Sequence, residues 1–170
     1  MKYLLSLAVL SVLLTNSLNA QNRPQSPPAK VSETIASGAT ISIAYSQPSL
    51  RGRTIGKDVE PMKDKVWRMG ANSATTFETD KDVTVQGQTL PAGKYSLFGL
   101  WTDDGYTVIF NKATGIWGTQ YDQNKDKDAL KVKASVKTAD ASQEQLAYTI
   151  DKSGVVNLLW GNMVIGVNVK

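Results

Sequence analysis

Three arginines, Arg51, Arg53 and Arg68, are the residues whose type and spacing best suit ligand recognition. After residue 23 the chain has no other arginine, and lysine supplies every other positively charged side chain. A guanidinium group is a planar fork of N–H donors that fits a carboxylate, a phosphate or two sugar hydroxyl groups, which an ammonium group does not. The cluster of arginines therefore predicts a polar recognition site in this part of the chain.

Residues that complement such a site lie close to the arginines or in one further loop. Trp67 precedes Arg68, polar residues follow it, and Trp117 stands between two glycines that let the backbone turn sharply. Aromatic rings stack on sugar faces and on cations, and loops at the end of a β-scaffold often form a recognition surface. We therefore expect a site for a small polar ligand, a glycan or an envelope partner. The candidate ligand-binding residues are Arg51, Arg53, Arg68, Trp67, Asn72, Thr75 and Trp117.

The same residues also have a purely structural interpretation. Arg51 or Arg68 could form ion pairs with Asp58, Glu60 or Glu78 and so hold a long loop across a sheet edge. Large aromatic side chains are usually buried, so the indole rings of Trp67 and Trp117 could instead fill the core. The sequence leaves both interpretations open.

The sequence offers little for catalysis, because it contains no histidine and no cysteine. The commonest general base, the commonest zinc ligands and every thiol nucleophile are thereby excluded. A glycosidase would need two facing carboxylates, for which Glu78 with Asp58, Glu60 or Asp80 are the candidates. Solvated surface charge explains these acids better, so we assign no catalytic residue. A hydrolase of this kind, or a purely structural interaction protein, is the alternative function.

Metal, cofactor and nucleic-acid binding are not expected. Residues 122–128 alternate oxygen ligands like the start of a calcium-binding loop, but Lys127 replaces the required glycine and Lys133 replaces the closing glutamate. The net charge of +4 is spread over many lysines. Nucleic-acid binding usually requires a denser basic face.

The start of the chain has the pattern of an export signal. Lys2 precedes an apolar run, Leu4 to Leu14, that is too short to span a bilayer. We expect a signal peptide over residues 1–20, cleaved after Ala20, and a periplasmic or extracellular protein that is not embedded in a membrane. Residues 21–38, rich in proline and polar residues, predict a flexible leader. Residues 39–170 predict one β-sandwich domain.

The remaining sequence alternates apolar and polar residues with the period of a β-strand. The segments 95–101 and 106–110 are apolar on both faces, so they predict central strands joined by a hairpin at Asp103–Asp104–Gly105. Ser153–Gly154 and Gly161–Asn162 predict turns that separate the last three strands. About nine or ten short strands favour an all-β fold, a two-layer antiparallel β-sandwich with possible jelly-roll connections, over a closed barrel.

Several motifs in the same order also resemble one known family. They are residues 45–53, 65–77, 90–98, 108–112 and 115–118. Together they resemble the domain of unknown function 2911 family, which consists of small exported bacterial proteins. Members often carry glutamate where this chain has Ser73. The resemblance implies export and the extent of the domain, and it implies no particular activity.

Overall fold

The alternating sequence forms an all-β, antiparallel fold, as predicted. The computed structural model describes residues 25–170, so the expected signal peptide at residues 1–20 lies outside the described residues. One short 3-10 helix, Lys125–Lys127, precedes the ninth strand. The strands are β1 (Pro28–Thr34), β2 (Thr40–Ser46), β3 (Val66–Trp67), β4 (Thr75–Thr79), β5 (Val83–Val85), β6 (Gln88–Leu90), β7 (Gly93–Thr102), β8 (Gly105–Asn111), β9 (Asp128–Ile150) and β10 (Val155–Asn168).

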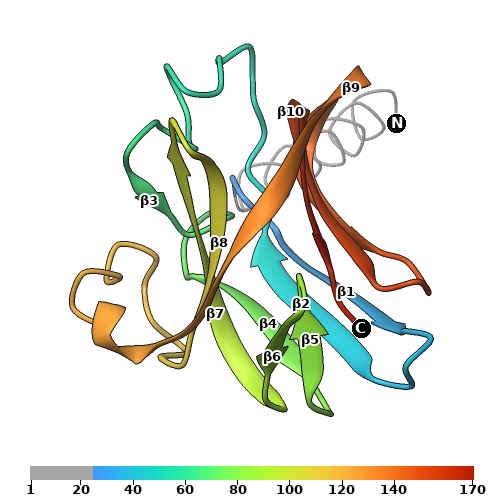
Figure 1. Ribbon diagram of the computed structural model, residues 1–170. Coiled ribbons are helices and arrows are strands. Elements are labelled where there is room, and N and C mark those ends of the chain that lie inside the picture. Colours follow the sequence, from blue (N-terminus) through green and yellow to red (C-terminus); the bar gives the residue numbers. More distant parts are fainter. Residues whose placement is uncertain (1–24) are drawn as a thin grey trace, which may run out of the picture.

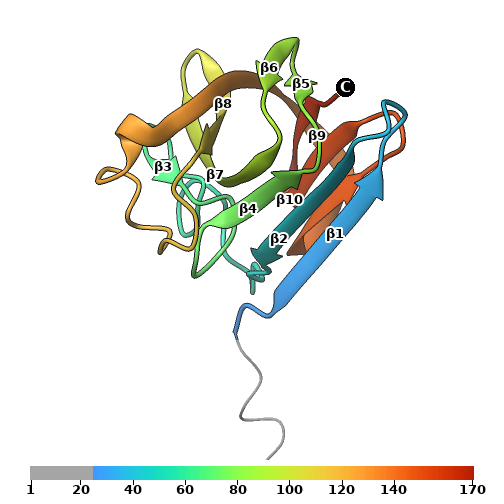
Figure 2. The ribbon, with the colours of Figure 1, turned by 90° about the horizontal axis from the view of Figure 1, so that it is seen from below.

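The main sheet has eight strands in the order β1-β2-β4-β7-β8-β9-β10, with β3 paired to β7. Neighbours follow the order of the chain, as in a meander, and β5 and β6 form a separate hairpin. The sheet curls back on itself, so that β10 and the end of β9 face β1 and β2 over a shared core (Figures 1 and 2). The result is a sandwich-like arrangement of two layers.

The core lies between these two layers because each strand turns its apolar residues inward. Ile41, Ile43 and Phe77 from one side meet Leu158 and Ile165 from the other in one buried cluster. The two segments that are apolar on both faces, β7 and β8, are central strands as expected. They are joined by the predicted hairpin at residues 103–105, with Thr102 paired to Gly105.

The prediction of a flexible leader over residues 21–38 is wrong for residues 28–34, which form a strand. Pro28–Thr34 forms β1, which pairs antiparallel with β2 from Pro28–Ser46 to Thr34–Thr40. Val31 packs against the core cluster while Lys30 is exposed. The strand lies at a sheet edge, where few apolar residues and an initial proline are tolerated, and this explains its polar composition.

The end of the chain also differs from the expected three short strands. Gly161–Asn162 does not end a strand, because β10 continues through it to Asn168. The pairing of β9 with β10 is irregular here: Gly161 pairs with Gln143 and Met163 with Thr138, so β9 has extra residues opposite Asn162. Gly161 has a φ of 57°, which suits glycine, so the sequence signal of a turn marks a β-bulge instead.

The described residues, 25–170, contain no helix long and apolar enough to span a membrane.

Candidate functional site

The predicted recognition residues lie on the long connection between β2 and β4, which is mostly irregular. β9 holds its first part, since the N–H of Leu50 donates to the Glu144 carbonyl (2.9 Å) and Ser49 bridges Gln145. Strand β3 holds its second part against β7, with Trp67 paired to Gly99. The connection is therefore fixed at two points, and the residues between them are displayed beside the end of the sandwich.

A cavity of about 350 Å³ opens along this connection, and we call it the arginine pocket. Its volume lies at the lower end of the range of about 300–1,000 Å³ found for small-molecule sites. Trp160 of β10 also lines it, with its indole N–H donating to the Glu60 carbonyl (2.8 Å). Its lining includes four charged side chains, a tryptophan and an asparagine: Arg53, Asp58, Glu60, Arg68, Trp67 and Asn72.

Four of the seven candidate residues therefore line one cavity: Arg53, Arg68, Trp67 and Asn72. Trp67 is only 4% exposed and its indole N–H donates to the Gly70 carbonyl (3.0 Å). It therefore forms part of the floor of the pocket and does not display a ring for stacking. The Asn72 side chain is exposed, and its only hydrogen bond within residues 25–170 is a long one, 3.4 Å, to the Ser46 hydroxyl.

Arg68 is the most unusual residue of the pocket. Its Nε is buried and has no hydrogen-bond partner in the described part of the chain. Its aliphatic stem lies against Gly118, where a Cβ would come within 2.7 Å of the Arg68 Cγ. The loop that carries Trp117 thus packs against the stem of Arg68, whose side chain lines the pocket and donates no hydrogen bond to any of residues 25–170.

Arg53 is held differently. Its Nε donates to the Leu50 carbonyl at 2.9 Å, and Nη2 donates to the Ser49 carbonyl at 2.7 Å. A guanidinium group has five N–H donors, so three remain for a ligand. The two backbone bonds fix the orientation of the plane of this guanidinium group.

Two carboxylates share the pocket with the two arginines. Asp58 accepts the backbone N–H of Thr54 at 2.9 Å, and Glu60 accepts that of Met62 at 2.6 Å. Within residues 25–170 no guanidinium nitrogen lies within 4.0 Å of a carboxylate oxygen, and all three ion pairs there use lysine. The structural alternative, in which the arginines pair with Asp58, Glu60 or Glu78, is therefore not observed.

The other three candidates do not line the pocket. The Arg51 side chain is exposed, and its backbone N–H donates to the Glu144 carboxylate at 2.8 Å. Thr75 is fully buried, and its hydroxyl donates to the Met69 carbonyl at 3.0 Å, so it positions the connection. Trp117 is 52% exposed and bridges Ser73 beside the pocket.

Glu78, the carboxylate that we considered as a catalytic residue of a hydrolase, lies outside the arginine pocket. Glu78 is exposed on β4, 4.0 Å from the ammonium of Lys94 on the neighbouring strand β7. Asp80 accepts the backbone N–H of Thr40 at 2.7 Å, and this bond lowers the pKa of the Asp80 carboxyl. Neither residue lines the arginine pocket. Within residues 25–170 no group of three acidic side chains is placed to hold a metal ion.

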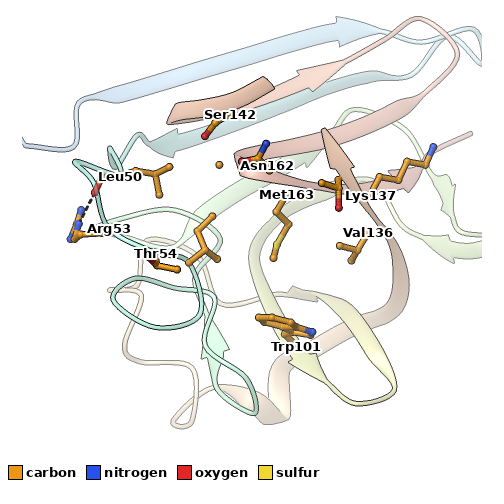
Figure 3. Close-up of a pocket in the computed structure, with 12 residues that line it drawn as sticks. Leu50, Arg53, Thr54, Trp101, Val136, Lys137, Ser142, Asn162 and Met163 are labelled. Carbon is orange, nitrogen blue, oxygen red and sulfur yellow. Dashed lines mark hydrogen bonds between the residues drawn. The ribbon is translucent and has the colours of Figure 1, made fainter. Parts of the chain in front are cut away.

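A second, larger cavity of about 480 Å³ was not anticipated from the sequence. It lies at the irregular pairing of β9 and β10, and Figure 3 shows Trp101, Met163 and Asn162 around it. We call it the bulge pocket. Gly161–Asn162 was the available signal, but in a sequence a bulge glycine and a turn glycine look alike. Arg53 lines both cavities.

Comparison with known proteins gave one match. The model of a family described as "Protein of unknown function (DUF2911)" matches residues 26–169. No curated protein and no solved structure matched the chain.

Proposed function

The chain belongs to the DUF2911 family, whose description names no activity, and from the geometry of its site we propose that it is a binding protein for a small, uncharged polar ligand. The ligand class is a saccharide unit, which would occupy the arginine pocket. The proposed contacts are the guanidinium groups of Arg53 and Arg68 and the amide of Asn72, with Asp58 and Glu60 as acceptors.

The state of Arg68 is the observation that carries this proposal. Within residues 25–170 its buried Nε has no hydrogen-bond partner and its guanidinium group makes no ion pair. A buried donor left unpaired costs about 1–3 kcal/mol, so such a group is expected to serve another purpose. The Nη groups of the same guanidinium group also donate to no acceptor within residues 25–170, and ligand oxygens in the pocket would accept from them.

The balance of charge favours hydroxyl groups over an anion. Two arginines and two carboxylates line the pocket, so its formal charge is close to zero. A polyanion would meet Asp58 and Glu60, and like charges at short range are unfavourable. Hydroxyl groups both donate and accept hydrogen bonds, so a saccharide satisfies all of these side chains at once.

The test is a thermal-shift screen of neutral monosaccharides and disaccharides, followed by calorimetric titration of the sugars that stabilise the protein. Arg68→Gln shortens the side chain and removes the positive charge, and it should abolish the stabilisation. Arg51→Gln makes the same chemical change at an exposed arginine outside the pocket and should preserve it. Sugar binding that is equal in both variants would refute the site, and acidic sugars that bind more tightly than neutral ones would refute the ligand class.

Export remains part of the proposal. The apolar run after Lys2 and the small residue Ala20 support a cleaved signal peptide, and binding of a saccharide suits a protein of the cell envelope. Mass spectrometry of the protein from a fractionated bacterial host tests this. A mature chain that begins at Gln21 in the periplasmic or extracellular fraction is expected, and an uncleaved cytoplasmic chain would contradict it.

A further inference from the structure

The bulge pocket differs in character from the arginine pocket. Its apolar wall consists of Leu50, Ile55, Trp101, Val136 and Met163. Its charged residues are Arg53 and Lys137, and none of the described residues that line it is acidic. The cavity therefore combines an apolar surface with positive charge that no carboxylate of its lining balances.

The apolar wall results from the local strand irregularity. Because Gly161 has no side chain, Ile55 and Leu50 approach it closely: a Cβ there would lie 2.8 Å from the Ile55 Cδ1 and 3.6 Å from the Leu50 Cδ1. Residues 54–59 continue past Trp101, and a Cβ on Gly56 would lie 3.3 Å from that indole ring. The wall is therefore built from four separate segments of the chain: the connection between β2 and β4, and strands β7, β9 and β10.

Part of this apolar surface faces solvent. Val136 is 49% exposed, and Trp101 is only partly buried. Trp101 lies on one side of the hollow with Met163 across from it (Figure 3). Apolar side chains exposed together in a concave surface mark binding sites more often than single exposed residues do.

The two positive charges flank the hollow. Arg53 lies at one end, where it is hydrogen-bonded to Leu50, and Lys137 lies at the other with its side chain extended away from the centre (Figure 3). Within residues 25–170 the Lys137 ammonium forms no ion pair, so its side chain can rotate toward the bulge pocket without breaking one. An elongated ligand could therefore place its apolar body on Trp101 and an anionic group at either end.

We propose that the bulge pocket is a second binding site, which takes an organic anion with an apolar body, such as an acyl or aromatic carboxylate. The volume of about 480 Å³ is within the range of small-molecule sites. Asn162, Thr138 and Ser142 on the rim can donate hydrogen bonds to the anionic group. The site is independent of the saccharide proposal, although Arg53 lies between the two cavities.

The first experiment titrates the full-length protein with 8-anilino-1-naphthalenesulfonate, a fluorescent anion with an aromatic body. One probe per chain is expected to bind with a rise in fluorescence. Val136→Asp and Lys137→Glu each place a carboxylate at the pocket and should weaken binding by about tenfold or more. Lys152→Glu, in the exposed turn between β9 and β10, makes the same charge change outside the pocket and should not.

Competition then distinguishes the two ligand sources. Octanoate and 1-naphthoate are expected to displace the probe, and the more effective one identifies an acyl or an aromatic ligand. The neutral alcohol 1-octanol should displace it at least about tenfold less well. Binding that is unchanged in both pocket variants would overturn the site, and equal displacement by 1-octanol would overturn the anionic class.

A circular dichroism spectrum of each variant shows whether the sheet is intact. If a variant fails to fold, Lys137→Gln, at an exposed position, provides the same comparison with a smaller expected effect. Titration of Lys137→Glu with a sugar that binds the wild-type protein separates the two proposals. Loss of the anion alone supports two sites, whereas loss of both ligands would indicate one shared site and overturn this inference.

Discussion

The stem of Arg68 occupies the space that Gly118 leaves by having no side chain. A Cβ on Gly118 would lie 2.7 Å from both the Cβ and the Cγ of Arg68, and closer still to its Cδ. The backbone N–H of Gly118 also donates to the Asn72 carbonyl at 3.2 Å. Two segments that are far apart in the sequence thus meet here, and the position of the proposed ligand-binding guanidinium group depends on a glycine.

Gly118→Ala should therefore move Arg68. The φ of Gly118 lies outside the left-handed region, so alanine is unfavourable here only because of steric overlap. We expect a loss of about 1–3 kcal/mol in the free energy of unfolding, the usual cost of overpacking. Urea denaturation of the two single variants and the double variant with Arg68→Ala measures it. The double variant should be more stable than additivity predicts, and strict additivity would contradict the contact.

Two buried tyrosines should respond in opposite ways to loss of the hydroxyl group. The Tyr106 hydroxyl is buried and has no partner among residues 25–170, whereas the Tyr148 hydroxyl donates to the Met69 carbonyl at 2.8 Å. Tyr106→Phe should therefore raise the free energy of unfolding by about 1 kcal/mol, and Tyr148→Phe should lower it by about 1 kcal/mol. Urea denaturation checks both values. Destabilisation by Tyr106→Phe would show that its hydroxyl group has a partner.

The turn between β9 and β10 should make the free energy of unfolding depend on pH in the acidic range. The Asp151 carboxylate accepts hydrogen bonds from the Ser153 hydroxyl (2.6 Å), then from the backbone N–H groups of Ser153 and Val155, and these bonds lower its pKa below 3.8. Because the pKa of Asp151 is lower in the folded state than in the unfolded state, its ionised carboxylate stabilises the protein at pH values above the unfolded-state pKa. This contribution is lost as the pH falls through the folded-state pKa.

Asp151→Asn should therefore reduce the difference in unfolding free energy between about pH 5 and about pH 2.5. Asp140→Asn is the matched control, because Asp140 is exposed on β9 and its carboxylate accepts no hydrogen bond within residues 25–170. Urea denaturation at the two pH values gives the difference for each variant. An equal pH dependence in wild type and Asp151→Asn would contradict the contribution of this turn.

The central strands were predictable because burial on both faces leaves an unambiguous pattern. β7 and β8 are apolar on both faces and enclose a two-residue turn, so their identity and pairing follow from local sequence. The bulge in β9 and β10 was not predictable in this way. Whether Gly161 ends a strand or continues it depends on the pairing with Gln143, and such long-range pairing leaves no local signal.

The candidate site could be predicted only in part, because residue type is visible in the sequence whereas the backbone conformation of a long connection is not. Four of the candidate residues line one cavity because the connection between β2 and β4 is folded against one end of the sheet: Arg53, Arg68, Trp67 and Asn72. Arg51 is two residues from Arg53, yet it lies outside the pocket, because a φ of 51° at Arg51 and the Gly52 turn direct the side chains differently. Residue type indicated which side chains could bind a ligand, whereas backbone conformation decides which of the three arginines line the pocket.

The edge strand β1 should contribute to stability through the one apolar side chain that it packs against the core, although its polar sequence gave no sign of a structural role. Val31 packs against the core cluster and pairs with Ile43, whereas the preceding residue, Lys30, is exposed. Val31→Ser should lower the free energy of unfolding by about 1–2 kcal/mol, since a partly buried valine loses its apolar contacts. Lys30→Ser should change it by less than about 0.5 kcal/mol, as for most surface substitutions. Urea denaturation compares them, and equal effects of the two substitutions would mean that residues 28–34 contribute to stability only through their backbone hydrogen bonds.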